Sequence, residues 1–330
     1  MTRGRRTKGA SRLAAIYDCV GIYLIGLILL AAGAFVSEEF FTARNFMDIL
    51  NAVALLGMAA AGMAFITYSG NMADLSIPSI MAFSGIITVA ALPFGLLPAL
   101  LLGVAAGMLI GAMNGFVVGR FNANPILWTL AVAFFMEGFM RFTWSNNQVY
   151  PDIEPGTSGA AFIEIFRTSI CGVPLIVVVM LGMFVAGHLV MTRTRFGIES
   201  KLTGSCRAAA RTTGINVPRV VMTGFLAAAF CASIAGIFIT SLNKLGVFYL
   251  GKGYDFKAVT AVVIGGMMLS GGRGNMLGVL GGVLVIGLLA NIMTFMGINT
   301  FQQNIVTGAI FIAVVGLGQY RLRKRGKDYA

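Results

Sequence analysis

Long apolar stretches separated by short polar segments dominate the pattern of residues along the chain. A helix that crosses the ~30 Å hydrocarbon core of a bilayer needs about 20 mostly apolar residues. Stretches of this kind predict ten membrane spans, at residues 16–36, 49–69, 75–92, 95–119, 126–144, 172–192, 219–241, 256–269, 276–296 and 302–320. The third and eighth spans are short and have polar edges, so either could be a broken or re-entrant helix.

Composition supports a membrane protein. Hydrophobic residues make up 58% of the 330 positions and charged residues only 11%, against about 25% charged residues in soluble domains. The predicted fold class is therefore an all-α integral membrane protein with about ten transmembrane helices. The first span resembles a signal peptide, because basic residues precede it and Ala32-Gly33-Ala34 mimics a cleavage site. The length of its apolar run favours an uncleaved helix.

Charge predicts the orientation of the chain. Most of the 24 basic residues fall on one side if the N-terminus is inside, and basic loops mark the cytoplasmic side. We therefore expect a cytoplasmic basic N-terminus at 1–15, a single transmembrane domain at 16–320 and a cytoplasmic basic tail at 321–330. The net charge of +12 is explained by this orientation in the inner membrane, and no nucleic-acid partner is expected.

The ten spans divide into five plus five, and the second half then begins on the outer side. This is the arrangement of an inverted repeat, which is common among transporters. Glycines recur every four residues in the fourth span, from Gly103 to Gly119, and again at Gly274, Gly278 and Gly282. Small residues at this spacing allow close helix packing in lipid. The contacts they make lie either within the molecule or at a subunit interface.

Residues for catalysis or for metal binding are scarce. The chain has a single histidine, His188, and its four cysteines are dispersed, so no metal-ligand spacing or nucleophile–base set is recognisable. The segment Gly246–Gly253 approaches a P-loop, but Gly253 stands where the Ser or Thr that binds magnesium would be. We expect no catalytic or metal-binding residue, and ATP hydrolysis would require another polypeptide.

Polar residues inside the apolar stretches need an explanation. Gly70 and Pro78 break helix continuity on either side of Asn71, Asp74 and Ser76, which predicts either a plain turn with a capping Asp or a broken helix that lines a translocation path. Asn114 and Asn291 lie in the fourth and ninth spans, where they either bond across helices or face a cavity.

Two ionisable residues lie together in the fifth span. Glu137 and Arg141 are four residues apart, so they share one helical face and are expected to pair.

The loop at 193–218 is the longest segment predicted on the cytoplasmic side. Its run from 199 to 213 could form a short basic helix in the membrane interface. Attraction to lipid and docking of a soluble partner both fit this composition. The turn Ser270-Gly271-Gly272-Arg273-Gly274 is read as a tight cytoplasmic hairpin, because glycines allow close approach and Arg273 can reach the interface.

Several stretches resemble the permease subunits of bacterial ABC importers for monosaccharides, the ribose, xylose, galactose and autoinducer-2 group. The most specific runs from Gly253-Tyr254-Asp255-Phe256 through 261–266 to 269–274; others are 194–217 and Asp74-Leu75-Ser76. Asn71-Met72-Ala73 and Ile77-Pro78 depart from the family pattern, which leaves the substrate class and the geometry at this break open.

The resemblance implies a permease that translocates a monosaccharide or small polyol and works as a homo- or heterodimer. It implies a two-domain cytoplasmic ABC ATPase that holds ATP and Mg, with no cofactor in this chain, and a periplasmic or lipid-anchored sugar-binding protein. The coupling residues would be Arg195, Phe196, Gly197, Arg207, Ala208, Arg211, Gly214, Ile215 and Asn216. The path would use Asn71, Asp74, Ser76, Asn114 and Asn291, and Ser270–Gly274 would form the cytoplasmic hairpin.

Two alternatives remain at this stage. An inverted-repeat secondary transporter needs ionisable residues near the midplane to couple an ion, and the chain offers few beyond Asp74 and the Glu137/Arg141 pair. A membrane-embedded enzyme lacks a recognisable nucleophile or metal set.

Overall fold

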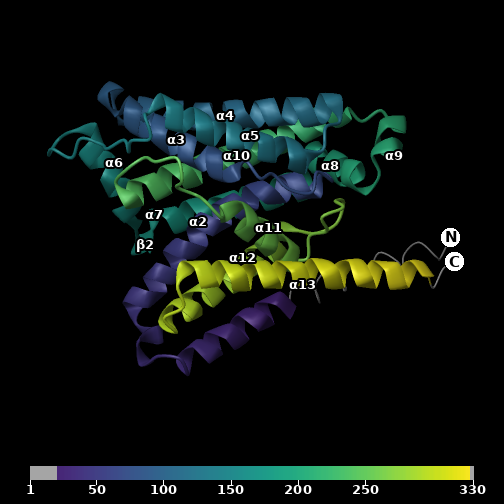
Figure 1. Cartoon of the computed structure of the whole chain (residues 1–330). Helices are drawn as coiled ribbons and strands as arrows, with labels where there is room; N and C mark the ends of the chain where they lie inside the picture. Colours follow the sequence, from purple (N-terminus) through teal and green to yellow (C-terminus); the bar gives the residue numbers. More distant parts are fainter. Residues whose placement is uncertain (1–20, 328–330) are drawn as a thin grey trace.

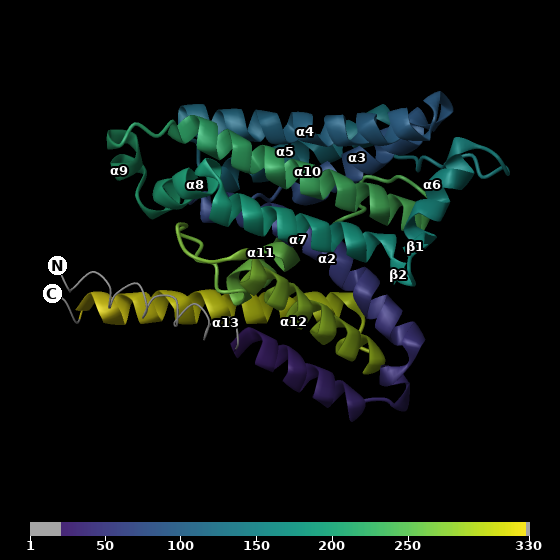
Figure 2. The ribbon, with the colours of Figure 1, turned by 180° about the vertical axis from the view of Figure 1, so that it is seen from behind.

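The computed structural model describes residues 21–327 and consists almost entirely of helices (Figures 1 and 2). The expected basic N-terminus at 1–15 lies outside the described residues. The elements are a helix at Gly21–Ala34, η1 (Glu38–Phe41), α2 (Ala43–Tyr68), α3 (Ile77–Ala91), η2 (Leu92–Phe94), α4 (Leu96–Phe121), α5 (Pro125–Thr143), α6 (Ser158–Arg167), β1 (Ser169–Ile170), β2 (Val173–Pro174), α7 (Leu175–Arg193), α8 (Arg195–Ser205), α9 (Arg207–Thr212), α10 (Val217–Asn243), α11 (Tyr254–Ile264), α12 (Met276–Phe295) and α13 (Thr300–Lys327).

Each predicted span overlaps a helix of the described part, which covers the first span only from residue 21 onward. Between residues 21 and 327, seven helices are long and apolar enough to cross a membrane, and two shorter apolar helices lie at Gly21–Ala34 and Thr300–Gly316. The expected all-α membrane fold is thereby confirmed. The two spans expected to be short are α3, with 15 residues, and α11, with 11. The helix α13 runs past the predicted end of its span at 320, through Lys327.

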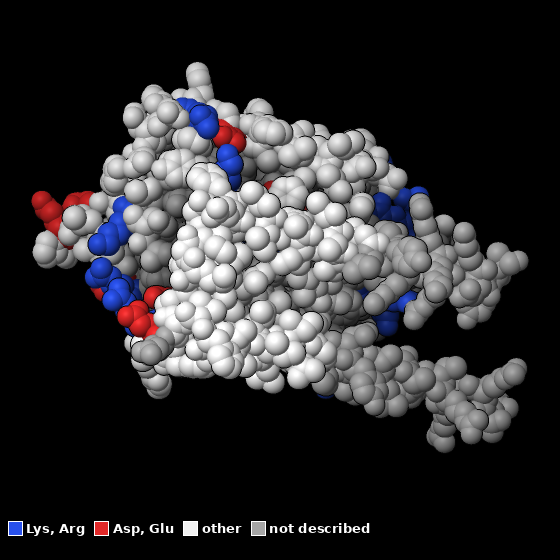
Figure 3. Space-filling view, turned by 60° about the horizontal axis from the view of Figure 1, so that its bottom comes forward, with Lys and Arg blue, Asp and Glu red and all other residues white. Residues whose placement is uncertain are grey.

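The surface matches this assignment. Figure 3 shows a broad face of the described residues that is largely free of charged side chains, with Lys, Arg, Asp and Glu gathered toward its edges. Large side chains on α4 and α5, such as Leu109 and Phe135, are 71% and 66% exposed. Water would penalise so much exposed apolar area, whereas lipid does not.

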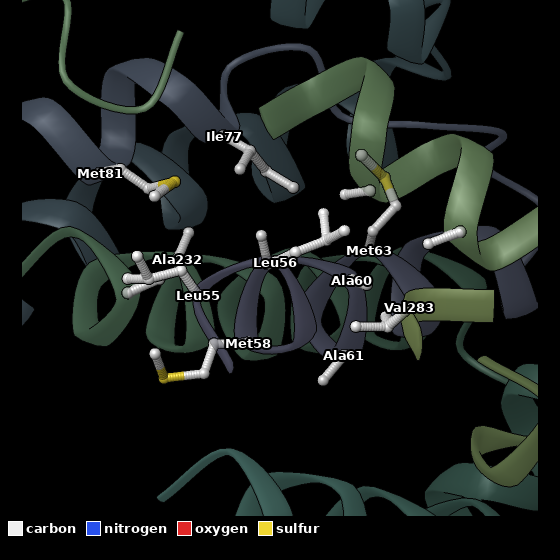
Figure 4. Close-up of a cluster of buried hydrophobic side chains, with 14 of the residues drawn as sticks. Leu55, Leu56, Met58, Ala60, Ala61, Met63, Ile77, Met81, Ala232 and Val283 are labelled. Atoms are coloured by element: carbon white, nitrogen blue, oxygen red, sulfur yellow. The ribbon is translucent and has the colours of Figure 1, made fainter. Parts of the chain in front are cut away.

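The core forms around α2, which packs against α7, α10, α11 and α12. Its labelled side chains point to several sides: Leu56 and Met63 lie on the side of Ile77 of α3, whereas Met58 and Ala61 point the opposite way (Figure 4). Met58 and Met63 are fully buried. A helix that is apolar all round belongs in the interior of a bundle, and this position explains why the break that follows α2 is also buried.

The glycine ridge of α4 packs within the molecule. A Cβ at Gly115 would lie 2.7 Å from the Cα of Met222, and one at Gly119 would lie 2.8 Å from the carbonyl oxygen of Pro218. Both neighbours are on α10, so the glycines let two helix backbones approach closely. On α12, Gly278 and Gly282 face α11 in the same way. The sequence left open whether the glycines make contacts within the molecule or at a subunit interface. At these positions the contacts lie within the molecule.

The contacts follow a repeated pattern. The helices α3 and α4 pack against each other and against α10, while α11 and α12 pack against each other and against α2. Matching α2 with α10, α3 with α11 and α4 with α12 maps one set of contacts onto the other. This exchange of partners is what a five-plus-five repeat predicts.

The two ends of the bundle differ. The short helices α8 and α9 lie at the same end as the last residues of α13, and we call this the α8 end (Figures 1 and 2). The helix α6 and the antiparallel pair β1–β2 lie at the opposite end, the α6 end. Neither α6 nor β1–β2 is expected from the sequence, because both are too short and polar to register as spans.

Candidate functional site

A break in helical structure separates α2 from α3 inside the bundle. It runs from Ser69 to Ser76, and the backbone turns there through positive φ angles at Gly70 (+79°) and Met72 (+55°). The amide of Asn71 donates to the carbonyl of Ile66 at 3.2 Å, and the hydroxyl of Thr67 donates to the carbonyl of Met72 at 2.8 Å. These bonds satisfy backbone groups that the helix leaves free where it ends.

A chain of hydrogen bonds links this break to two other helices. Trp128 Nε1 of α5 donates to Asn114 Oδ1 of α4 at 3.1 Å, and Asn114 Nδ2 donates to Ser76 Oγ at 2.8 Å. Ser76 in turn donates from Oγ (2.6 Å) and from its amide (2.7 Å) to Asp74 Oδ1. Asp74, Ser76 and Asn114 are fully buried, so the structure brings three of the predicted path residues into one network.

Two members of this network are not expected from the sequence. Trp128 is described above, and Thr129 Oγ1 accepts a hydrogen bond of 2.9 Å from the amide of Leu75. Trp and Thr are common in apolar spans, so the sequence around these two residues does not mark them as functional. The one hint that a partner should exist nearby was Asn114, a polar residue in the neighbouring span. Within the described part of the chain, Oδ2 of Asp74 has no hydrogen-bond partner. Asp74 thus combines a cap-like bond from the amide of Ser76 at one oxygen with a second buried oxygen that accepts no hydrogen bond from the described residues.

Asn291 does not join this network. Its Nδ2 donates to Asn45 Oδ1 at 2.7 Å, and Asn45 also donates to the carbonyl of Phe40 at 2.7 Å. Asn45 lies in the first turn of α2, at the far end of that helix from the break. Of the two readings left open for Asn291, bonding across helices is the one observed. Of the five expected path residues, Asp74, Ser76 and Asn114 share one network, Asn71 lies in the same break, and Asn291 is separate.

The segment at 193–218 forms two short helices, α8 and α9, where the sequence suggested one at 199–213. Cys206 separates them in extended conformation, with φ −163° and ψ 107°. Among the expected coupling residues, Arg195, Ala208, Arg211, Gly214 and Asn216 are exposed, Phe196, Arg207 and Ile215 are half-buried, and Gly197 is buried. The exposed members form a basic surface at the α8 end, and the others fasten the segment to the bundle.

Arg207 ties this segment directly to the break. Its guanidinium donates to Asn71 Oδ1 and, at 2.7 Å, to Asn122 Oδ1 at the end of α4. Asn71 is fully buried and donates to Ser69 Oγ at 2.7 Å. Partial burial, with the nearby charge of Arg211, lowers the pKa of Arg207, but a guanidinium stays protonated in proteins. A fixed charge of α9 thus reaches the first residues of the break.

Glycines bring three segments together beside this contact. A Cβ at Gly271 would lie 2.5 Å from the Cα of Gly70 and 2.9 Å from the Cα of Gly204. Gly70 belongs to the break, Gly204 to α8, and Gly271 to the loop between α11 and α12. The amide of Gly272 also donates to the carbonyl of Tyr68 at 2.9 Å. We call Gly70, Gly204, Gly271 and Gly272 the glycine junction.

The expected hairpin at 270–274 is therefore partly an internal contact. Gly271 and Gly272 are buried in the junction, while Ser270, Arg273 and Gly274 are exposed. The backbone closes on itself through a 3.1 Å bond from the amide of Met268 to the carbonyl of Arg273. The arginine side chain is thereby held at the surface of the α8 end.

The Glu137/Arg141 pair also forms as expected. Arg141 NH2 lies 2.7 Å from Glu137 Oε1, and its guanidinium carbon lies 4.0 Å from the ring centre of Phe248. Both side chains are more than a third exposed. The pair is a surface contact, separate from the network around Asp74.

Comparison with known proteins agrees with this arrangement. Residues 45–315 match the family model described as branched-chain amino acid transport system / permease component. Similar curated proteins include the ribose import permease protein RbsC of Bacillus subtilis, 32% identical over 90% of this chain and 91% of that protein. The probable ABC transporter permease protein YphD of Escherichia coli is 35% identical over 90% of this chain and 88% of its own length.

A third relative is the L-arabinose ABC transporter permease protein AraH of Azospirillum brasilense, 29% identical over 92% of this chain and 88% of that protein. No solved structure matches the chain significantly. The resemblance stated from the motifs is confirmed, and the permease family together with the apolar helices makes this a multi-pass inner membrane protein. The chain belongs to the branched-chain amino acid transport system / permease component family.

Proposed function

We propose that this chain is the permease subunit of an ATP-binding-cassette importer and moves a monosaccharide or small polyol across the inner membrane. Support comes from relatives named as ribose and L-arabinose permeases that align along nearly their whole length. The observation that carries the mechanism is the contact of α8 and α9 with the break at 69–76, through Arg207 and the glycine junction.

The α8 end faces the cytoplasm in this proposal, as do both termini. The basic residues at that end include Arg193, Arg195, Lys201 and Arg211, and basic segments stay on the cytoplasmic side. A separate two-domain ATPase holds ATP and Mg and docks on the exposed face of α8 and α9. A periplasmic or lipid-anchored binding protein delivers the sugar at the α6 end, and two permease subunits, identical or different, form the membrane unit.

The mechanism follows from what α8 touches. Movement of α8 displaces Gly204, which is packed against backbone atoms of Tyr68 and of the 271–272 turn. The backbone atoms around Gly204 are packed so closely that they leave no space for a movement of Gly204 alone. The break and the turn must therefore move together with α8. The break carries Ser76 and Asp74, and its hydrogen bonds to Asn114 then rearrange. Work done by the ATPase thus reaches buried polar groups that a sugar can use.

Reconstitution in proteoliposomes tests the proposal. The permease is combined with its ATPase and binding protein, and uptake of labelled aldopentoses and aldohexoses is measured with ATP inside and with ionophores that abolish ion gradients. We expect uptake that needs ATP and resists the ionophores. Uptake driven by an ion gradient without ATP would instead establish a secondary transporter.

A pair of charge reversals locates the ATPase. Arg211→Glu at the α8 end should reduce co-purification of the ATPase and abolish uptake, while Arg167→Glu on α6 should leave co-purification unchanged. Both residues are exposed arginines in the last turn of a short helix, so the pair isolates location from charge. Equal behaviour of the two variants would contradict docking at α8 and α9.

A further inference from the structure

The segment that precedes α11 returns into the bundle before the helix begins. Val247 and Leu250 are buried, and a Cβ at Gly251 would lie 3.1 Å from the Cβ of Met81 and 3.3 Å from the carbonyl oxygen of Pro78. Both neighbours belong to α3, near its start. The helix α11 therefore starts beside the start of α3, which is the helix that corresponds to it in the repeat.

An acidic residue stands at the start of each of these two helices. Asp74 precedes α3, and Asp255 lies in the first turn of α11. Two broken spans thus bring their helix starts toward each other. In transporters with inverted repeats, substrate sites form where such discontinuous helices meet.

A pocket of about 440 Å³ opens between the start of α11 and the first half of α13, two helices that pack against each other (Figure 1). Its volume falls within the range of about 300–1,000 Å³ that is typical of small-molecule sites. The side chains that line it are polar or aromatic for the most part: Asp255, Lys257, Thr260, Asn304, Thr307 and Phe311.

The polar groups of the pocket are disposed to bind a ligand. The hydroxyls of Thr260 and Thr307 donate to carbonyls of their own helices, at 2.6 and 2.8 Å, so their oxygens can still accept. Among the described residues, neither Lys257 nor Asn304 has a side-chain hydrogen bond or ion pair. Ionisable side chains within membrane spans are costly and mark a polar pathway by default, and Asp255 and Lys257 both line this pocket.

We propose that this pocket is a sugar-binding site on the translocation path, formed by α11 and α13. Asp255 and the threonine oxygens accept from sugar hydroxyls, Lys257 and Asn304 donate to them, and Phe311 offers an apolar face. A set that mixes donors and acceptors of both charges suits a neutral polyhydroxyl compound better than an ion. This assignment rests on the proposed function. It replaces Asn291, which the sequence analysis expected on the translocation path, by residues of α11 and α13.

Isosteric substitutions in the reconstituted importer test the site. Asn304→Leu removes a donor and an acceptor at similar volume, and Thr260→Val removes only the hydroxyl. The matched control is Thr223→Val on α10, because Thr223 also donates to a carbonyl of its own helix, at 2.9 Å, and is exposed. Uptake of D-ribose, L-arabinose and D-galactose is measured for each variant, alongside ATPase activity and co-purification of the partners.

We expect Asn304→Leu and Thr260→Val each to lower uptake of the preferred sugar about ten-fold, the effect of one lost hydrogen bond to a bound ligand. The ratio of rates between sugars should shift, because sugars place their hydroxyls differently, and a purely structural defect would lower all rates together. Thr223→Val should behave as wild type.

Two results would overturn the inference in different ways. If both pocket variants show wild-type uptake rates and wild-type ratios between sugars, the pocket is not a sugar-binding site, whereas the proposed importer function still stands. An importer with the wild-type chain that hydrolyses ATP but moves none of the three sugars, nor any other aldose tested, would refute the proposed function and this site with it.

Discussion

Replacing Gly271 by alanine should disturb the coupling of α8 to the break. The new Cβ would lie 2.5 Å from the Cα of Gly70, whereas carbon atoms in contact keep about 3.5–4.0 Å. Either Gly70 or the turn must therefore move by about 1 Å. Overpacking of this kind costs about 1–3 kcal/mol, and the φ of +86° at this position costs an L-residue about 1–2 kcal/mol more.

Gly266→Ala is the matched control. Gly266 lies in the same loop with φ +81°, and a Cβ there meets nothing within 4 Å. The two variants therefore share the backbone penalty and differ only in the contact at the junction. We expect Gly271→Ala to show a melting midpoint several degrees below that of Gly266→Ala in detergent.

Coupling is read out as sugar molecules taken up per ATP hydrolysed by the reconstituted importer. This ratio should fall for Gly271→Ala and stay near wild type for Gly266→Ala. Equal midpoints and equal ratios for the two variants would show that the close approach at the junction has no role in stability or coupling.

Other variants test the remaining contacts. Asn114→Leu should destabilise the protein by about 1–3 kcal/mol, because Trp128 and Ser76 lose their partner in the interior; a thermal midpoint equal to wild type would contradict the network. Arg207→Lys keeps the charge but loses the fork that reaches two asparagines, so uptake should fall while membrane insertion is retained, and full activity would show that charge alone matters. Arg273→Lys should retain uptake if the arginine at the α8 end contributes only positive charge, whereas full activity of Arg273→Ala would leave the glycines as the only functional part of that turn.

The sequence predicted those features of the fold that depend on the residues of a single helix. Every apolar stretch overlaps a helix of the described part, and polar edges at 75–92 and 256–269 marked the two short helices. Glycine spacing predicted close packing of α4, since every fourth residue lies on one face of a helix. Such patterns need no knowledge of the partner helix.

The sequence could not predict the contacts between segments that lie far apart along the chain. Arg207 and Asn71 are 136 residues apart, and Asn291 and Asn45 are 246 apart. A polar residue in an apolar span shows that a partner must exist, but its spacing does not show which of several helices supplies it. For this reason the sequence grouped Asn114 with Ser76, which it does contact, but also grouped Asn291 with residues that it does not contact.

The position of Arg207 also explains why the break can be both buried and movable. A buried polar group that loses its partner costs about 1–3 kcal/mol, so Asn71, Ser76 and Asn114 resist separate displacement. Arg207 belongs to α9, yet it bonds to the buried Asn71 at one end and to Asn122 of α4 at the other. A rigid shift of α8 and α9 with the break keeps the bond between Arg207 and Asn71. The change then falls on the bonds that join the moving part to α4 and α5, which are Arg207–Asn122, Leu75–Thr129 and Asn114–Ser76. Of these three bonds, the one between Asn114 and Ser76 is fully buried. We therefore expect the contact between α3 and α4, at the hydroxyl of Ser76, to be the point where a movement imposed from the α8 end first alters the interior.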